Sequence, residues 1–285
     1  MAMQSVSIAV TGSGGSGVMT AGQLLLDAAA GVGWYGVMTR SFGPQIRGGE
    51  AAALIRLADE PVQGMDDAFD LLLGLDWGNF HRFASEIPLH RGSLIVSDPA
   101  SGPVPELLTE GEHEVIACPL ADRAKAVAHG RANMVALGVL GELIGLPVRA
   151  LTGRVRQTLE RKGPLVRDAA LEAVDAGFAE GARARRPPLL TGTPPQPVEE
   201  RWNMSGNEAA GLGALRAGVR FVAAYPITPA TDILEWLAAR LPARGGVLLQ
   251  AEDELAAINM CIGASFGGVP SLTATSGPGL SLMTE

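Results

Sequence analysis

Residues 205–275 read SGNEAAGLGALRAGVRFVAAYPITPATDILEWLAARLPARGGVLLQAEDELAAINMCIGASFGGVPSLTAT, and their pattern decides the fold class. Helical and strand-like segments alternate along this stretch. We expect helices at 205–218, 229–241 and 253–267 and strands at 219–224, 246–251 and 270–275. Strict alternation of this kind indicates a parallel sheet covered by helices. We therefore predict a doubly wound α/β domain.

The last residues of the chain begin a further element. The sequence SGPGLSLMTE, which ends at Glu285, has the turn and apolar residues of a starting helix. We therefore expect this domain to be incomplete and truncated at its C-terminus.

A proline-rich segment precedes this domain. Residues 186–200, RPPLLTGTPPQPVEE, hold five prolines and show no helical or strand period, which favours an extended connection. We expect a first domain at 1–185, a linker at 186–202 and the second domain at 203–285. The first domain has strand-like runs before helical ones, so we predict an α/β or α+β fold that opens on a βα unit. The expected strands are 5–11, 51–57, 69–75, 92–97 and 113–118, and the expected helices are 18–30, 131–145, 149–161 and 165–181.

Net charge, the length of apolar runs and cysteine spacing argue against several classes of function. The net charge of −8 argues against nucleic acid or an anionic membrane as the main partner, since both need clustered Lys and Arg. No apolar run reaches the roughly 20 residues of a membrane span, and the N-terminus lacks the pattern of a signal peptide, so we expect a cytoplasmic protein. Cys118 and Cys261 stand far apart without metal-ligand spacing, and we expect two buried thiols and no metal site.

A glycine-rich turn, Gly12–Gly17 (GSGGSG), lies between the first expected strand and helix. Such a turn lets a phosphate approach a helix N-terminus and satisfies the dinucleotide fingerprint. The fingerprint also needs an acid about 20 residues on, and residues 32–38 (VGWYGVM) contain none. NAD binding, another phosphate ligand and a purely structural turn remain alternatives.

We expect the segment Arg40–Glu50 (RSFGPQIRGGE) to form a loop, in which two arginines lie among turn residues. The guanidinium groups of Arg40 and Arg47 can bind a carboxylate or a phosphate. A solvated loop with arginines at a domain interface is the alternative.

Polar residues follow the strands of the second domain. In Tyr225-Pro226-Ile227-Thr228-Pro229 we expect Thr228 to be a helix N-cap and Pro229 the first helical residue. The same hydroxyl would face the crevice at the carboxyl end of a parallel sheet, where ligands bind.

The next two strand ends carry the other polar groups. Among Glu252, Asp253 and Glu254, two acids suit the first turn of a helix, and the third would be partly desolvated and able to exchange a proton with a cofactor ring. The turn that contains Ser276 and Gly277 can line a ligand wall or only make the bend.

In series, YPITP, QAEDE and TSGPG strongly resemble the pyrimidine-binding domain of 2-oxoacid:ferredoxin oxidoreductases. The earlier segments GSGGSGVMTAGQLL, RSFGPQIRGGEAAALIRL and FDLLLGLD resemble the γ domain of the same family, which one subtype fuses ahead of the α part. The resemblance covers nearly the whole chain. It favours the 2-oxoglutarate type, because of the fused order and the QAEDE variant.

The resemblance implies thiamine-diphosphate chemistry. In this family a strand-end glutamate hydrogen-bonds the aminopyrimidine ring and promotes proton removal from the thiazolium ring; by position that residue is Glu252, with Glu254 as the second choice. Thr228 would bind the substrate, with Arg40 and Arg47 as further candidates near an acidic substrate or coenzyme A. Thiamine diphosphate would contact a larger set: Tyr225, Pro226, Ile227, Pro229, Glu252, Ser276 and Gly277.

The resemblance also implies partners. The chain has no cysteine cluster and no acidic motif for magnesium and diphosphate, so we expect a β subunit to hold Mg²⁺ and the iron–sulfur cluster, and ferredoxin to accept the electrons. Coenzyme A would be a co-substrate, and the chain alone would be inactive. A nucleotide- or NAD-binding module and a non-catalytic assembly subunit are the alternative interpretations.

Overall fold

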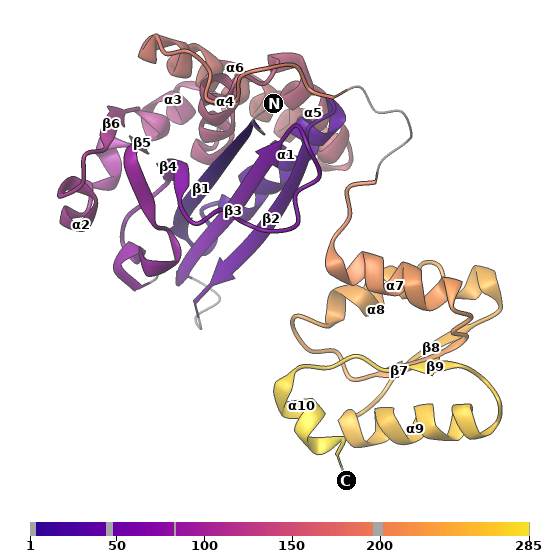
Figure 1. Ribbon diagram of the computed structural model, residues 1–285. Coiled ribbons are helices and arrows are strands. Elements are labelled where there is room, and N and C mark those ends of the chain that lie inside the picture. Colours follow the sequence, from indigo (N-terminus) through magenta and orange to yellow (C-terminus); the bar gives the residue numbers. More distant parts are fainter. Residues whose placement is uncertain (1–3, 44–47, 83, 196–201, 285) are drawn as a thin grey trace. The chain divides into compact units, whose positions relative to one another are not determined.

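The computed structural model describes residues 4–43, 48–82, 84–195 and 202–284. The chain forms two compact units, residues 1–201 and 202–285, which are described separately below (Figure 1). Both units combine strands with helices, and the predicted α/β fold class is confirmed.

Unit 1 is built on a six-stranded sheet in the order β2-β3-β1-β4-β5-β6. Strands β1, β4, β5 and β6 run parallel, whereas β3 is antiparallel to both of its neighbours, β1 and β2. The strands are β1 (Ser5–Ser13), β2 (Tyr35–Phe42), β3 (Glu50–Ala58), β4 (Phe69–Gly74), β5 (Leu89–Ser97) and β6 (Glu114–Ala117). The apolar runs of β1, β3 and β4 are buried on both faces, as a covered sheet requires, whereas β2 and β6 at the two ends of the order are largely exposed or half-buried.

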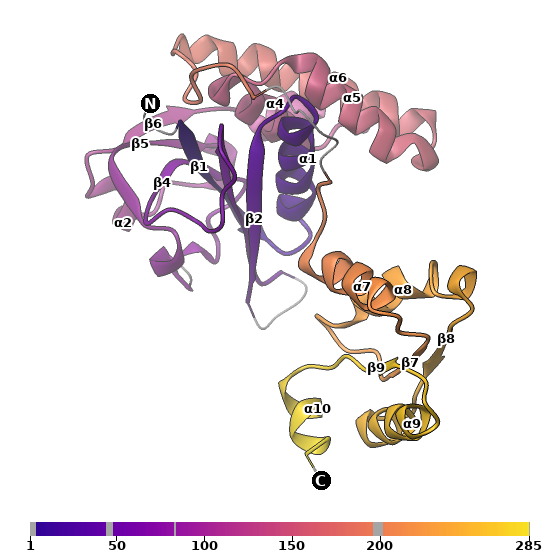
Figure 2. The ribbon, with the colours of Figure 1, turned by 45° about the vertical axis from the view of Figure 1, so that its right-hand side comes forward.

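Helices cover one face of this sheet and form its larger core (Figure 2). The unit contains α1 (Val18–Gly31), α2 (Glu106–Thr109), α3 (Leu120–Ala126), α4 (Ala132–Ile144), α5 (Val148–Leu159) and α6 (Pro164–Gly181). Helix α4 is apolar almost all round because it packs between other elements, and 11 of its residues are buried. On the opposite face, Trp77, Phe80, Ile87 and Leu108 cover a smaller core.

The segment Arg40–Glu50 differs from the loop that we predicted from sequence. Arg40, Ser41 and Phe42 lie in β2 and Glu50 begins β3, so both ends of this segment belong to an antiparallel pair of strands. Turn-forming residues suggested a loop, but the ladder extends from Tyr35–Ala58 to Phe42–Ala51 and supplies the hydrogen bonds that override local preference. Arg47 lies outside the described residues.

The proline-rich segment packs partly on unit 1. Leu190 is 5% exposed and belongs to the main core of that unit, and the Leu189 N–H donates to the Leu143 carbonyl over 2.9 Å. Residues 186–195 therefore make specific contacts although they contain no helix or strand.

Unit 2 holds a parallel sheet in the order β8-β7-β9. Helices α7 and α8 pack against the core on one face, while α9 lies on the other, where Cys261 is buried against Ala223 (Figure 1). This arrangement is the predicted doubly wound sheet. The elements are α7 (Gly206–Arg216), β7 (Phe221–Ala224), α8 (Thr231–Ala238), β8 (Val247–Gln250), α9 (Glu254–Phe266), β9 (Ser271–Leu272) and α10 (Gly277–Leu282).

Candidate functional sites

The glycine-rich turn Gly12–Gly17 joins β1 to α1 in unit 1. Gly15 and Gly17 have φ angles of +99° and +92°, which side chains other than glycine rarely adopt. Gly17 is the N-cap of α1, and the first turn of α1 holds no acidic residue. Among the described residues, the N–H groups of Val18, Met19 and Thr20 have no protein acceptor. These groups and the helix dipole make the start of α1 suited to an anion.

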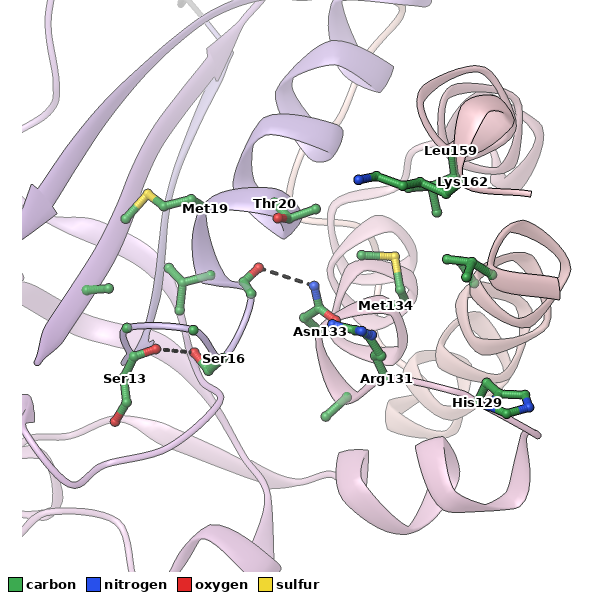
Figure 3. A pocket seen from close by; sticks show the side chains of 18 of the residues that line it. Ser13, Ser16, Met19, Thr20, His129, Arg131, Asn133, Met134, Leu159 and Lys162 are labelled. Atoms are coloured by element: carbon green, nitrogen blue, oxygen red, sulfur yellow. Dashed lines mark hydrogen bonds between the residues drawn. The ribbon is translucent and has the colours of Figure 1, made fainter. Parts of the chain in front are cut away.

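A cavity of about 890 Å³ opens at this turn (Figure 3). Its basic side chains come from distant parts of the chain, with His129 and Arg131 just before α4 and Lys162 between α5 and α6. Lys162 extends toward Thr20 at the start of α1. The apolar part of the wall comprises Val18, Met19, Phe42, Ala51, Ala132, Met134, Leu159, Val166 and Ala170. A wall with both cationic and apolar parts suits a ligand that carries phosphates and a less polar group.

The turn is held on several sides. The Gly14 N–H donates to the Gly49 carbonyl over 2.6 Å, and the Gly48 N–H donates to the Gly14 carbonyl over 3.3 Å. On another side, Asn133 Nδ2 donates to the Gly17 carbonyl over 3.3 Å. The structure thus brings together two motifs that the sequence presented separately, the glycine-rich turn and the glycines that precede Glu50.

Of the two arginines predicted to bind an anion, the structure describes only Arg40. Arg40 is exposed on β2, where its Nη2 lies 3.1 Å from Gln23 Oε1, and it does not line the described cavity. Arg47 is not among the described residues. The carboxylate that does line the cavity is Glu50, which is 8% exposed and pairs with Arg82 over 3.3 Å.

In unit 2 the predicted N-cap at Thr228 is wrong. Helix α8 begins at Thr231 with Ala230 at its N-cap, and the Thr228–Pro229 peptide bond is cis. The residues before α8 form a turn in which the Thr231 N–H donates to the Ile227 carbonyl over 2.9 Å. The Pro229 carbonyl accepts from Asn207 Nδ2 over 3.0 Å, which holds this residue outside the helix.

The two candidate glutamates have different surroundings. Glu252 lies exposed between β8 and α9. Glu254, the first residue of α9, is only 8% exposed, and its Oε1 accepts from Thr275 Oγ1 at 3.5 Å. A Cβ on Gly279 would lie 2.6 Å from the same Oε1, so α10 approaches the carboxylate closely because residue 279 is glycine. Asp253 caps α9 by accepting from the Ala256 N–H over 2.7 Å.

A cavity of about 520 Å³ lies in unit 2, beside the start of α8 and the turn into α10. Three of the predicted cofactor-binding residues line it: Pro229, Ser276 and Gly277. Thr275, which contacts Glu254, lines it too, whereas Tyr225, Pro226, Ile227 and Thr228 do not. The remaining lining residues are Asn207, Ala230, Ile233, Thr273, Ala274, Leu280 and Met283. The buried Thr273 hydroxyl has no hydrogen-bond partner among the described residues, which leaves a polar group for a ligand.

Sequence reasoning missed several residues around the first cavity. Arg131, Asn133 and Lys162 carried no local signal, because they lie more than 100 residues after the turn that they approach. Within the described ranges no cluster of three or more His, Cys, Asp or Glu side chains has the arrangement of a metal site. No helix in those ranges has the length and apolar character to cross a membrane.

Comparison with known proteins identifies the family. Residues 7–180 match the model of pyruvate ferredoxin/flavodoxin oxidoreductases, and residues 212–285 match the thiamine diphosphate-binding model of pyruvate flavodoxin/ferredoxin oxidoreductases. The chain belongs to the pyruvate ferredoxin/flavodoxin oxidoreductase family. The predicted resemblance is thereby confirmed.

Individual relatives agree with this assignment. The chain is 34% identical to a 2-oxoglutarate:ferredoxin oxidoreductase from Magnetococcus marinus, solved with 2-oxoglutarate, coenzyme A and succinyl-CoA bound, with a TM-score of 0.87. That match covers 99% of this chain and 49% of the other. A 2-oxoglutarate synthase subunit KorA from Methanothermobacter marburgensis is 55% identical over 88 residues, which are 31% of this chain and 24% of that protein.

A third relative corresponds to a separate subunit. The γ subunit of a keto/oxoacid ferredoxin oxidoreductase from Geobacter sulfurreducens is 25% identical, with a TM-score of 0.50, and covers 62% of this chain and 99% of its own. The match thus spans nearly the whole of that γ subunit, whereas this chain spans only a quarter to a half of the other two relatives.

Proposed function

We propose that this chain is part of a 2-oxoacid:ferredoxin oxidoreductase that decarboxylates a 2-oxoacid oxidatively with thiamine diphosphate and coenzyme A. The observation that carries the proposal is the buried carboxylate of Glu254, which contacts Thr275. Glu254 does not itself line the cavity of unit 2, but Thr275 does, and both residues lie in the segment that matches the thiamine diphosphate-binding model. 2-Oxoglutarate is the favoured substrate, because the relative with 34% identity holds 2-oxoglutarate and succinyl-CoA.

The residues of unit 2 fit the pyrimidine end of thiamine diphosphate. A buried carboxylate needs a hydrogen-bond partner, and a ring nitrogen of the cofactor can supply one. The Thr273 hydroxyl and the turn at Ser276 and Gly277 add polar groups to the same cavity. Bound thiamine diphosphate supplies a carbon nucleophile for the 2-oxoacid carbonyl and accepts the electron pair that decarboxylation releases.

We assign the proton-transfer role to Glu254 in preference to Glu252. Glu252 is exposed, so water would compete for its carboxylate. Glu254 is buried at the N-terminus of α9, where the helix dipole stabilises a negative charge. Thr275 Oγ1 donates to one carboxylate oxygen over 3.5 Å, and the second oxygen would exchange a proton with the pyrimidine ring. Thr228 is retained as a substrate ligand on the family resemblance, and Tyr225, Pro226 and Ile227 as residues near the cofactor.

The cavity of unit 1 suits the phosphate-bearing part of coenzyme A. The free N–H groups at the start of α1 can donate hydrogen bonds to one phosphate, and Arg131 and Lys162 can neutralise others. The apolar wall near Met19 and Leu159 can contact the less polar part of the molecule. NAD fits less well, because β2 carries no acid that could bind a ribose hydroxyl. Arg40 and Arg47 remain candidates for contact with an acidic substrate.

The proposal includes partner proteins. A separate γ subunit among the structural neighbours supports an enzyme assembled from several chains. We assign Mg²⁺ and the diphosphate to a β subunit that also holds an iron–sulfur cluster, with ferredoxin as the electron acceptor. The chain would then contribute the pyrimidine-binding residues and the coenzyme A site.

The test uses the full-length subunit, purified anaerobically with its partner and assayed by viologen reduction. We expect reduction that depends on thiamine diphosphate and coenzyme A and is faster with 2-oxoglutarate than with pyruvate or branched-chain 2-oxoacids. An intact, cluster-loaded complex that reduces no viologen with any 2-oxoacid would refute the proposed activity. In that case, titration with NAD would distinguish a nucleotide-binding module from an assembly subunit.

A matched pair of variants tests the glutamate assignment. Glu254→Gln should lower turnover by about 100-fold or more, since a positioned acid or base contributes 10²–10⁴-fold. Glu252→Gln should stay within about twofold of the unmodified enzyme, because its side chain is solvated. The reverse order would return the role to Glu252. Binding of thiamine diphosphate by both variants, measured by calorimetry, would separate lost chemistry from lost cofactor.

A further inference from the structure

The short segment after β4, residues 75–79, contacts the glycine-rich turn Gly12–Gly17. The Leu75 N–H donates to the Thr11 carbonyl over 2.8 Å and extends the pairing of β4 with β1 by one residue. The next residue, Asp76, therefore stands beside Ser13, where β1 ends and the turn begins.

Both carboxylate oxygens of Asp76 bind Ser13. The Ser13 N–H donates to Oδ2 and the Ser13 hydroxyl donates to Oδ1, each over 2.7 Å. A Cβ on Gly12 would lie 3.2 Å from Oδ2, closer than an ordinary contact, so glycine at this position leaves room for the carboxylate. Hydrogen bonds to a charged acceptor are stronger than neutral ones, and two on one residue fix its backbone and side chain together.

The same segment also binds the glycine pair Gly48–Gly49. Asn79 Nδ2 donates to the Gly48 carbonyl over 2.9 Å, and Gly48 is bonded in turn to Gly14. The base of the segment is anchored by Trp77, which is 7% exposed and donates from Nε1 to Ser97 Oγ over 2.9 Å.

We propose that Asp76 and Asn79 are positioning residues for the phosphate groups of coenzyme A. They hold Ser13 and Gly48 so that the N–H groups at the start of α1 face the cavity with fixed geometry. This inference rests on the coenzyme A site proposed above, and nothing in it requires either side chain to touch the ligand, since neither lines the cavity.

Because Asp76 is negatively charged, a charge effect and a positioning effect would change the affinity for coenzyme A in opposite directions. If the carboxylate acted only through its charge, Asp76→Asn would strengthen the binding of an anionic ligand, because a nearby negative charge is removed. If it positions the turn, the same variant weakens binding. We expect Asp76→Asn to raise both the KM and the Kd for coenzyme A about tenfold, as the loss of a charge-assisted hydrogen bond does. The KM for the 2-oxoacid should not change.

Asp98 supplies a matched control. It directly follows β5 at the same edge of the sheet, is 2% exposed, and accepts from the N–H groups of Ala100 and Ala121 over 2.9 and 2.7 Å. It does not line the cavity. Asp98→Asn should lose at least as much thermal stability as Asp76→Asn and leave the KM for coenzyme A unchanged.

The measurements are steady-state kinetics and calorimetric titration with coenzyme A on the full-length subunit with its partner. Ser13→Ala, which removes one of the two hydrogen bonds, should show a smaller rise in Kd, and its effect should not add to that of Asp76→Asn. It also keeps the inference testable if Asp76→Asn fails to fold. An unchanged or lowered Kd in both variants overturns the positioning role. Failure of the unmodified enzyme to bind coenzyme A refutes the site itself.

Discussion

Replacing Gly17 with alanine tests the geometry of the phosphate-binding turn directly. Gly17 has a φ angle of +92°, and an added Cβ would lie 2.6 Å from Cγ of Asn133. Asn133 is 6% exposed and donates to the Gly17 carbonyl, so it has little room to move and would lose that bond if it did. Gly15 provides a control, because its φ angle is +99° and no atom lies within 4 Å of its added Cβ.

The magnitudes follow from these contacts. A left-handed conformation costs a residue with a Cβ roughly 1–2 kcal/mol, which applies to Gly15→Ala and Gly17→Ala alike. Gly17→Ala also loses the hydrogen bond of Asn133, which is worth about 1 kcal/mol. We therefore expect losses of about 1–2 kcal/mol for Gly15→Ala and about 2–3 kcal/mol for Gly17→Ala. For a unit of this size each kcal/mol lowers the Tm by roughly 2–4 °C.

The assay is scanning calorimetry of the full chain, following the transition of unit 1 in each variant. Gly17→Ala should melt below Gly15→Ala, and adding Asn133→Ala should recover part of the difference by removing the colliding amide. Equal Tm values for the two glycine variants would refute the steric argument and leave only the dihedral cost.

Three further predictions concern stability and reactivity. The Arg91 carbonyl and the Asp70 carboxylate accept from the ring of His90 and raise its pKa above 6.5, so this stabilisation is full below pH 6.5 and disappears as pH rises through the raised pKa. Because the ring is half exposed, this contribution to the free energy of unfolding should be below about 1 kcal/mol, and it should be absent in His90→Asn. The measurement is the urea midpoint as a function of pH, and the same pH dependence in both proteins would contradict the contact. Burial raises the pKa of the Cys118 thiol to about 12, so a thiol reagent at pH 8 should modify it only after denaturation; rapid labelling of the native chain would contradict this. Gly138→Ala should destabilise unit 1 by about 1–3 kcal/mol or more, because its Cβ would meet the Val174 carbonyl of α6, and a Tm within 1 °C of the original would contradict this.

Much of the fold follows from local pattern. In unit 2 the alternation of helical and strand periods predicted each α-helix and each strand that the structure describes, because each parallel strand needs a covering helix before the next can pair. The strand β2 escaped prediction, since its residues include Gly36, Arg40 and Ser41 and are held by pairing with β3 and not by their own preference. The start of α8 was placed two residues early for a related reason: Pro229 is a good first helical residue in general, but here its carbonyl is bound by Asn207.

The sequence by itself determined the fold class, the family resemblance and the set of motifs, because these depend on residue order over short stretches. Tertiary structure decided which residues of each motif meet. Glu252 and Glu254 are the same residue type in the same short motif, so the sequence does not distinguish them. In the structure Glu254 lies in the first turn of α9, where it contacts Thr275 and is buried. Likewise the glycine-rich turn acquires Asp76, Asn133 and Lys162 only when the sheet and helices pack, since contacts between residues 60 to 150 positions apart are set by burial of a shared core and have no local sequence signal.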